Sequence, residues 1–413
     1  MSRIVIWSPA YAPELLGIPP LVTQAAEWLA SRGHDVHVVA PMPNNPTRVI
    51  YPAYRGRLWL TERRGDVTVH RAWLRVRSAE SFFDKVLWEL TYVPVSAPFV
   101  LRRLRSTDVL VCLVPSLLAT IAGAAFARVA HGRSGAPRLV LWVQDLVVEA
   151  AAVVRDISAG KRRVLAEVRR GEMFAARAAD QIVICSPGFR SYFEERGVRT
   201  PITTVLNWVD VQAYDPTARR GSGPTRFVYG GNLGYTQGLE TLIDAAGLVG
   251  PDVHVEIVGD GNAAESVRQR AEGMPNVGVR PSVDWDTFPR LLASAEVLVL
   301  IQRRVAAGAN FPSKTAPYLA SGRPVLASLD GTTAVADVLR ESGGALLVAP
   351  EDPVALAGAM RRLHEDAALR SELADRGRRY AVAELSREAL LPRLERAFLN
   401  GLSASGPKVH SAQ

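Results

Sequence analysis

Short apolar runs along the chain alternate with stretches in which apolar residues recur every three or four positions. The first run, RIVIW at 3–7, is followed by a proline-containing loop and by a helical pattern over 21–31. Gly33 then precedes a second apolar run at 34–41, and a glycine in that place commonly ends a helix. This order of patterns predicts a βαβ unit.

Similar runs continue through the first half of the chain. They are apolar at nearly every position, and helical patterns lie between most of them. The runs are at 67–73, 108–115, 138–145, 180–186 and 201–207. Continuous apolar strands that alternate with helices are typical of a parallel sheet covered on both faces, so we expect one here.

A second series of the same kind follows a polar stretch. Residues 211–225 are rich in Pro, Gly and Arg, which is typical of a linker. Helical patterns again separate the apolar runs after it, which predict strands at 225–234, 254–261, 276–281, 296–302, 323–328 and 343–349. The pattern over 352–401 is helical, and the polar tail 402–413 is expected to be disordered.

These patterns predict an α/β fold with two Rossmann-like, doubly wound domains and an inter-domain cleft. We expect the first domain to span 1–210, the linker 211–225 and the second domain 226–385. A C-terminal helix over 386–401 is expected to pack back on the first domain. Ligands bind beyond the carboxyl ends of the strands in such sheets, so the turns after the strands are the places to search.

Composition narrows the class of protein only a little. With 48% hydrophobic and 22% charged residues, the chain is typical of globular proteins. The formal net charge of +8 suits nucleic acid, an anionic membrane surface or phosphorylated ligands, and the scattered arginines favour a solvated surface. Cys112 and Cys185 accompany apolar runs, which predicts buried, reduced thiols and a cytoplasmic location.

Nothing in the sequence predicts a membrane span or a signal peptide. No uncharged apolar stretch reaches the roughly 20 residues that a span needs. The nearest candidate, 86–101, contains Glu89 and two prolines and precedes the basic sequence RRLR. It predicts either a core helix or a segment that lies on a membrane surface.

The strongest chemical signal is the glycine-rich turn in VYGGNLGYTQGLETLIDAA, 228–246. Gly230, Gly231 and Gly234 follow a strand, and Gly238 opens a helix. Glycines let the backbone approach a ligand closely, and free amides at a helix start attract phosphate. Neither the P-loop nor the dinucleotide fingerprint is present. The alternative is a tight turn without a ligand.

A second candidate is NFPSKTAPYLASGRPVLAS, 310–328. Ser313, Lys314 and Thr315 begin a short helical pattern, and a hydroxyl, amides and one cation there could clamp a diphosphate. The alternative is an N-cap serine with a solvated lysine. Arg303, just past a strand, is a second cation or a surface residue. Asp260 in VGDG could accept a hydrogen bond from a base or hydroxyl, or satisfy its own turn.

The first half of the chain offers fewer candidates. Gly17 is the flexible point of the loop 8–20 and could approach the donor. Asp145 ends a predicted strand and could orient a hydroxyl or act as a base, or it could cap the following helix. His70 could lie in the core or near the acceptor. No His or Cys pair has metal-ligand spacing, so no metal is expected.

At these residues the chain resembles a family 4 glycosyltransferase of the GT-B fold. It is similar to the branch with colanic-acid-type fucosyltransferases and related exopolysaccharide or O-antigen enzymes. The resemblance covers nearly the whole chain and rests on several motifs together: YAPELLGIPPLVTQAAEWLASRGHDVHVVAP, AYRGRLW, VPSLLAT, WVQDL, LNWVD, GGNLGYTQGLETLIDAA, IVGDG, FPSKTAPYLASGRPVLAS and APEDPVALAGAMRRL.

The resemblance implies a retaining transfer from a nucleotide sugar without an obligatory metal. The C-terminal domain would bind the nucleotide diphosphate and the N-terminal domain the acceptor. Asp145 and Lys314 are then the expected catalytic residues. The expected donor-binding residues are Gly17, Gly231, Asn232, Gly234, Gln237, Asp260, Arg303, Ser313, Lys314 and Thr315. The expected partners are a donor and an acceptor sugar, with a lipid-linked acceptor and peripheral contact at the inner membrane face as the leading case, and no nucleic acid.

The chain departs from the wider family at several of these positions. Asn232 and Gln237 stand where that family commonly has Arg and Lys, and Ala309 and Pro317 stand where it often has two glutamates. These changes leave a non-catalytic nucleotide-sugar binder as an alternative. An epimerase of the same architecture is a further one, and a small secondary metabolite is the rival acceptor. An oxidoreductase is disfavoured because the dinucleotide fingerprint is missing.

Overall fold

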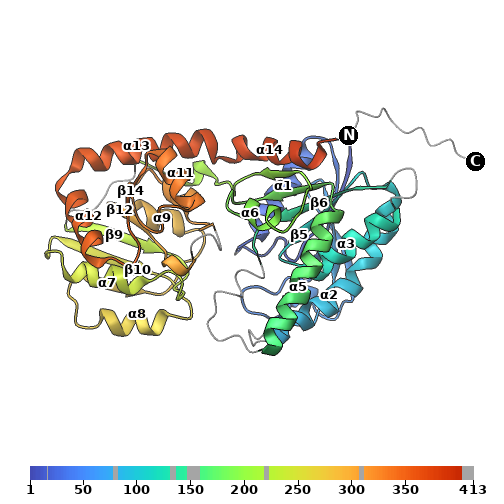
Figure 1. Ribbon diagram of the computed structural model, residues 1–413, viewed down its shortest axis with the longest axis horizontal. Helices are drawn as coiled ribbons and strands as arrows, with labels where there is room; N and C mark the ends of the chain where they lie inside the picture. Colours follow the sequence, from blue (N-terminus) through green and yellow to red (C-terminus); the bar gives the residue numbers. More distant parts are fainter. Residues whose placement is uncertain are drawn as a thin grey trace, which may run out of the picture. The chain divides into compact units, whose positions relative to one another are not determined.

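The computed structural model describes residues 1–15, 17–77, 82–130, 136–146, 159–217, 223–306 and 311–401. The chain divides into two compact units (Figure 1). The first contains Met1–Cys185, Phe189–Val205 and the described residues from Leu391 on; the second contains Ser186–Gly188 and Leu206–Leu390. The units therefore change at 206 and 391, against the expected 210 and 386. The expected tail 402–413 lies outside the described residues.

The first unit is built on one eight-stranded sheet in the order β3-β4-β2-β1-β5-β6-β7-β8. Its strands are β1 Arg3–Trp7, β2 Asp35–Pro41, β3 Trp59–Arg64, β4 Val67–Ala72, β5 Val109–Val114, β6 Arg138–Val143, β7 Gln181–Ile184 and β8 Ile202–Thr204. The predicted runs form the parallel part of this sheet. Sequence reasoning missed β3, which pairs antiparallel with β4 in the register Trp59↔Ala72.

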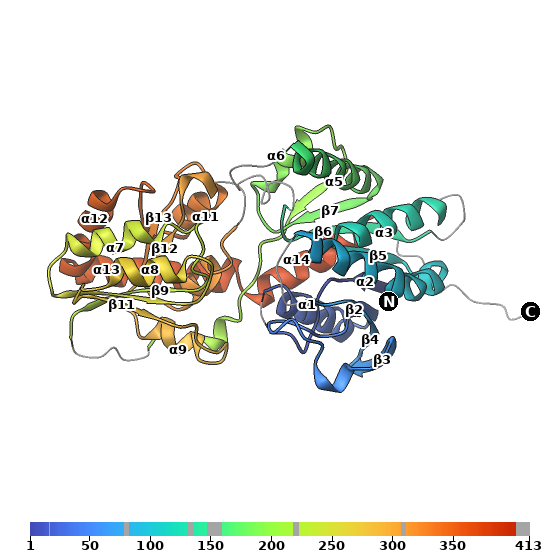
Figure 2. The same cartoon turned by 90° about the horizontal axis from the view of Figure 1, so that it is seen from below.

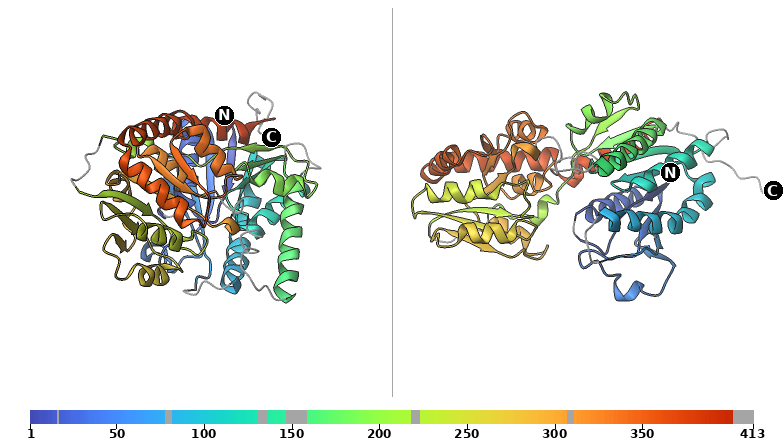
Figure 3. Two further views of the ribbon diagram at one scale, coloured as in Figure 1. Left: turned by 60° about the vertical axis from the view of Figure 1, so that its left-hand side comes forward. Right: turned by 60° about the horizontal axis from the view of Figure 1, so that its bottom comes forward.

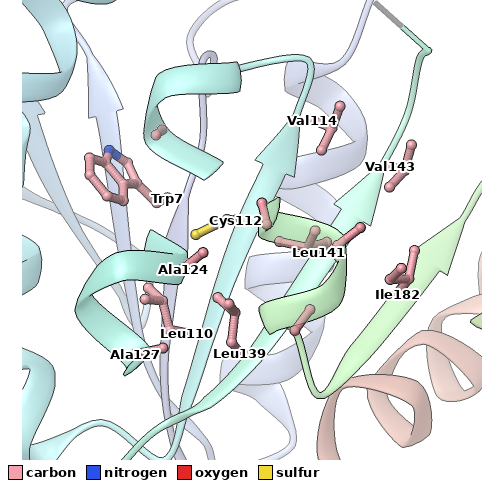
Figure 4. Packing of buried hydrophobic residues seen from close by; sticks show 14 of the residues in the cluster. Trp7, Leu110, Cys112, Val114, Ala124, Ala127, Leu139, Leu141, Val143 and Ile182 are labelled. Atoms are coloured by element: carbon pink, nitrogen blue, oxygen red, sulfur yellow. The ribbon is translucent and has the colours of Figure 1, made fainter. Parts of the chain in front are cut away.

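Helices cover both faces of this sheet. They are α1 Pro19–Ser31, α2 Phe82–Arg103, α3 Leu117–Ala130, α5 Ala159–Ala178 and α6 Phe189–Glu194. One face packs Trp7, Cys112 and Leu141 against Ala124 of α3 (Figure 4), and α2 and α5 lie beside α3 over the same face (Figure 3). Both cysteines are free and buried, and burial raises the pKa of each thiol to about 12.

The segment 86–101 lies within α2 and contributes to this core. The Ser96 hydroxyl accepts a hydrogen bond from the Trp7 indole at 3.0 Å, and the buried Tyr92 hydroxyl donates to the Ser8 carbonyl at 2.7 Å. Leu90 and Leu101 of the same helix remain about half exposed. Among the helices that the structure describes, none is both long and apolar enough to cross a membrane.

The last helix, α14 Arg387–Leu399, ends in the first unit. The Phe398 ring packs edge-on against Trp142, with 5.6 Å between the ring centroids. Glu395 accepts a hydrogen bond from the Trp28 indole at 3.0 Å and lies 3.1 Å from the His34 ring. Because Trp142 and Leu141 are neighbours on one strand, this helix covers the sheet face opposite α3.

The second unit has a six-stranded sheet in the order β11-β10-β9-β12-β13-β14. All its neighbours pair in parallel: β9 Thr225–Gly230, β10 Val253–Val258, β11 Val277–Arg280, β12 Val297–Ile301, β13 Val325–Ser328 and β14 Ala345–Val348. Its helices are α7 Leu239–Gly247, α8 Ala264–Ala271, α9 Phe288–Ala293, α10 Thr315–Ala320, α11 Ala334–Ser342, α12 Pro353–Glu365 and α13 Ala367–Glu384.

The core of the second unit is packed on one face by α7, α8 and α12. Phe227 and Tyr229 of β9 point into it together with Leu242 of α7 and Met360 of α12. α9 lies on the other face (Figure 2). Its Phe288 ring packs against Gly230. Alternation along β9 thus directs Tyr229 inward, immediately before the glycine turn.

The contact of α14 with the first unit can be tested by Phe398→Ala. Removing a fully buried ring should lower the free energy of unfolding of the first unit by about 3–5 kcal/mol, because the cavity it leaves cannot fully collapse. Denaturant unfolding followed by tryptophan fluorescence measures this, and Arg396→Ala, at an exposed position of the same helix, serves as the control. Equal unfolding midpoints for the two variants would contradict the packing described.

Candidate functional site

The loops after β9 and β10 meet in direct backbone contact. The Gly231 amide donates to the Val258 carbonyl at 2.9 Å, and the Leu233 amide donates to the Asp260 carbonyl at 2.8 Å. A Cβ at Gly259 would lie 1.8 Å from the Gly231 carbonyl oxygen, so no larger residue fits. Gly231 itself has a φ of 138°, which favours glycine. Of the glycines that sequence analysis selected in the turn, Gly231 therefore serves this approach of two loops.

Two buried tyrosines form hydrogen bonds with the backbone of the glycine turn. The Tyr318 hydroxyl accepts from the Gly230 amide at 2.9 Å and donates to the Gly230 carbonyl at 3.0 Å. The Tyr229 hydroxyl donates to the Asn232 carbonyl at 2.6 Å. Both side chains are fully buried, and sequence reasoning missed both roles. The only available signal was the position of Tyr229 directly before the two glycines.

Lys314 brings a positive charge to this turn. Its Nζ lies 3.8 Å from the centroid of the Tyr229 ring and would lie 3.0 Å from a Cβ at Gly231. The nitrogen is buried and has no hydrogen-bond partner among the described residues. Loss of hydration lowers the pKa of this ammonium group to about 7. The structure thus places an unneutralised cation against the loop that sequence analysis assigned to phosphate.

Ser313 and Thr315, the two residues beside Lys314 in the sequence, differ in exposure. Ser313 is exposed, and the N-cap of α10 is Lys314, whose side chain makes no capping bond. Thr315 is buried, and its hydroxyl donates to the Pro312 carbonyl at 2.8 Å. In this conformation Thr315 fixes the start of the helix rather than presenting its hydroxyl to a ligand.

Neutral amides lie over the other end of the turn. A Cβ at Gly234 would approach the Asn232 Nδ2 to 2.8 Å and the Gln237 Oε1 to 2.6 Å, so these two side chains fold over Gly234. Arg303 lies across Gly238, and its guanidinium group is 2.6 Å from Glu240 and 4.0 Å from Glu351. Arg303 is therefore already paired with carboxylates, unlike Lys314.

The Asp260 side chain bonds to the loop after β11 rather than to its own turn. Its carboxylate accepts from the Ser282 amide at 2.9 Å and from the Ser282 hydroxyl at 2.5 Å. These hydrogen bonds hold the pKa of Asp260 below its usual value. The side chain nevertheless remains exposed beside the glycine turn.

Comparisons with known proteins identify the family of the chain. Residues 17–208 match the family described as glycosyl transferase 4-like domain, and residues 224–366 match the family described as glycosyl transferases group 1. The two matches cover most of both units. The chain belongs to the group 1, family-4-like glycosyltransferases.

One full-length relative and two solved structures illustrate the similarity. A protein from Escherichia coli K12, named as a colanic acid biosynthesis glycosyl transferase, WcaI, is 27% identical over 97% of this chain and 99% of its own. Sucrose-phosphate synthase from Thermosynechococcus elongatus has a TM-score of 0.72 at 18% identity, covering 96% of this chain and 98% of its own. Anabaena HepE, solved with UDP-glucose, has a TM-score of 0.66 at 15% identity, covering 96% and 99%. The fold is therefore GT-B, as expected.

In the first unit of this glycosyltransferase, the two predicted residues differ in their surroundings. Gly17 has a φ of 83°, and no atom lies within 4 Å of the position a Cβ would take. Asp145 accepts from the Leu146 amide at 2.9 Å, and burial raises the pKa of its carboxyl group. It borders a cavity of about 20 Å³ that Glu172 and Phe193 also line, which has room for one water molecule but not for a sugar. The helix that it could cap lies outside the described residues.

Sequence reasoning also missed Glu89. Its carboxylate accepts from the Leu117 and Leu118 amides at 3.0 and 2.6 Å, so it caps α3 just beyond the carboxyl end of β5. Burial raises the pKa of Glu89 to about 7. His70 is a core histidine: its ring stacks on His37 and Phe99, and burial lowers its pKa to about 4.

Within the described ranges, no three His, Cys, Asp or Glu side chains are grouped so that they could hold a metal ion. A cavity of about 500 Å³ in the second unit is lined by α13 and by Arg323, and it contains none of the predicted donor residues. There Arg323 and Arg378 donate to main-chain carbonyls, among them those of Pro216 and Val211. These arginines hold the chain at the start of the predicted linker.

The backbone contact at Gly259 can be tested by Gly259→Ala. The added methyl group would overlap the Gly231 carbonyl, so the loops must separate, at a cost of about 1–3 kcal/mol in the stability of the second unit. Gly250→Ala is the control, because nothing lies within 4 Å of the corresponding Cβ position. Thermal unfolding of the two variants measures the difference. A Gly259→Ala protein as stable as the control would show that the loops are not in contact.

Proposed function

We propose that the chain is a retaining glycosyltransferase that uses a nucleoside-diphosphate sugar in polysaccharide or lipid-linked glycoconjugate synthesis. One observation carries the donor assignment: the buried Lys314 ammonium group lies at the glycine turn without an anion of its own. A diphosphate is the kind of ligand that such a cation and a glycine-rich loop bind. The UDP-glucose with which HepE was solved and the colanic acid biosynthesis in the name of WcaI support the same proposal.

In the proposed reaction, the bond between the sugar C1 and the diphosphate oxygen breaks. The acceptor oxygen forms a bond to C1 on the same face, and its proton passes to the diphosphate oxygen that leaves. The anomeric configuration is retained without a protein nucleophile. Lys314 would stabilise the negative charge that develops on the diphosphate, because a preorganised cation in a dry site needs little reorganisation.

The other predicted residues take supporting roles in this proposal. Asn232 and Gln237 would offer neutral hydrogen-bonding groups to the donor. Asp260 and Ser313, whose side chains are exposed, would also form hydrogen bonds with it. Asp145, which follows the carboxyl end of β6, would orient the acceptor hydroxyl through its carboxyl group, once that group is uncovered from the small cavity that it borders. No metal is required in this scheme, because Lys314 supplies the positive charge at the leaving group.

The proposed acceptor is lipid-linked and presented at the inner face of the cell membrane. Leu101 is half exposed at the end of α2, and the exposed Arg102 and Arg105 follow it. An apolar side chain beside arginines suits an anionic membrane surface. A non-catalytic binder is the second candidate, since Pro317 in α10 stands where the wider family often has a glutamate.

The role of Lys314 predicts that Lys314→Ala lowers kcat/KM by about a hundred- to a thousandfold, the usual cost of losing one charge-stabilising group. Because the ammonium group is buried and unpaired, the melting temperature should fall little or rise. Arg304→Ala is the matched control, since Arg304 is an exposed cation of the same unit, 3.7 Å from Asp330. Release of nucleoside diphosphate measures turnover. A Lys314→Ala enzyme with unchanged kinetics would contradict the proposed role.

The reaction itself is tested with a panel of nucleotide sugars and two acceptors, a polyprenyl-diphosphate sugar and a soluble sugar. We expect transfer to the lipid-linked acceptor, the same anomeric configuration in donor and product by NMR, and unchanged rates in EDTA. An inverted product would exclude retention, and loss of activity in EDTA would exclude the metal-free scheme. Binding of a nucleotide sugar without transfer to any acceptor would favour the non-catalytic binder.

A further inference from the structure

The Lys314 side chain is held in an unusual way for a cation. Its Nζ is buried and lies over the face of the Tyr229 ring at 3.8 Å from the centroid, and no described acceptor is within hydrogen-bond distance. On its other side lies the Gly231 backbone, where a Cβ would be 3.0 Å from the nitrogen. An aromatic face attracts a cation but supplies no hydrogen-bond acceptor for its three N–H groups.

The tyrosine ring that this ammonium group contacts is neutral, and the charged side chains of the neighbouring loops have partners of their own. Tyr229 of β9 and Tyr318 of α10 are buried phenols, and burial raises the pKa of each, so neither ionises near neutral pH. Arg303 beyond β12 is paired with Glu240 and Glu351, and Asp260 beyond β10 is bonded to Ser282. No carboxylate in the described part of the chain lies within ion-pair distance of Lys314. The charge of Lys314 is therefore compensated only by the ring.

We propose that Tyr229 is a positioning residue that holds the Lys314 amino group at the glycine turn, so that an entering diphosphate binds together with one proton. This inference rests on the proposed donor site. The entering oxygens supply the acceptors that Lys314 lacks and favour its charged form. The proton comes from solvent, adds to the neutral amine and remains on Lys314 while the diphosphate is bound.

The lowered pKa of Lys314 sets the pH range in which binding should take up a proton. Burial lowers the pKa of its ammonium group to about 7 in the free protein, whereas a bound dianion raises it. Below pH 7 the group is already charged, and binding takes up little proton. Above pH 7 binding must first protonate the amine, so affinity should fall by about tenfold per pH unit, as expected for uptake of one proton.

Isothermal titration calorimetry of the full chain with UDP, and then GDP, tests this. At pH 8 the terminal phosphate, with a second pKa of about 6, is fully ionised and contributes no proton. Titrations in buffers of different ionisation enthalpy should give uptake of about 0.9 proton per nucleotide, the fraction of an amine of pKa about 7 that is neutral at pH 8. Binding without uptake would overturn this inference alone. Failure of every nucleoside diphosphate to bind would overturn the proposed function.

Three variants test whether Tyr229 positions the Lys314 amino group or has only a general structural role. Tyr229→Phe keeps the ring and should keep the uptake and the pH slope. Tyr229→Leu removes the ring and lets water reach Lys314, so the pKa of the free amine should rise and proton uptake at pH 8 should fall to less than half. Tyr235→Leu, at an exposed tyrosine of the same loop, should behave as the natural protein. Equal uptake in Tyr229→Leu would overturn the role of Tyr229.

Lys314→Arg keeps the test decisive if Tyr229→Leu does not fold. A guanidinium group stays charged throughout this pH range. The variant should therefore bind UDP without proton uptake and with the same affinity at pH 7 and pH 8.5. Proton uptake that persists in Lys314→Arg would show that another group takes the proton, and would overturn the proposal.

Discussion

The close approach of the loops after β9 and β10 is the constraint on which the candidate site depends. The Gly231 carbonyl lies where a Cβ of residue 259 would be, so two glycines are needed to bring these loops together. The approach in turn lets the Lys314 amino group lie against the Gly231 backbone. A larger residue at either position would move the turn away from the lysine, and the site would lose its one unpaired cation among the predicted residues.

Much of the fold could be predicted because its strands are buried on both faces. Their apolar runs are continuous, and the glycines and polar stretches between them mark the turns. β3 was missed for the opposite reason: most of its side chains, in WLTERR, are exposed, as is common at a sheet edge. The mixed sheet of the first unit thus differs from the expected parallel one only where the apolar signal is absent.

The sequence suggested residues for the candidate site but did not indicate how their charges are paired. Sequence reasoning placed Arg303 and Lys314 together as cations at the donor site, yet the structure pairs Arg303 with Glu240, far away in the sequence, and leaves Lys314 unpaired. Such pairings depend on which strand ends become neighbours, and local motifs carry no information about that.

The neutral residues of the turn add no second charge beside Lys314. Asn232 and Gln237 fold over Gly234 and carry no charge, so they add hydrogen-bonding groups without repelling Lys314 or raising the cost of burying it. A second buried cation beside Lys314 would make the charged form of both groups less stable in the free protein. The ring of Tyr229 compensates the charge of the Lys314 ammonium group only in part. A carboxylate would compensate that charge more fully, but it would also compete with the diphosphate for the lysine. An aromatic partner therefore leaves the cation available to an anionic ligand, which an ion pair such as that of Arg303 does not.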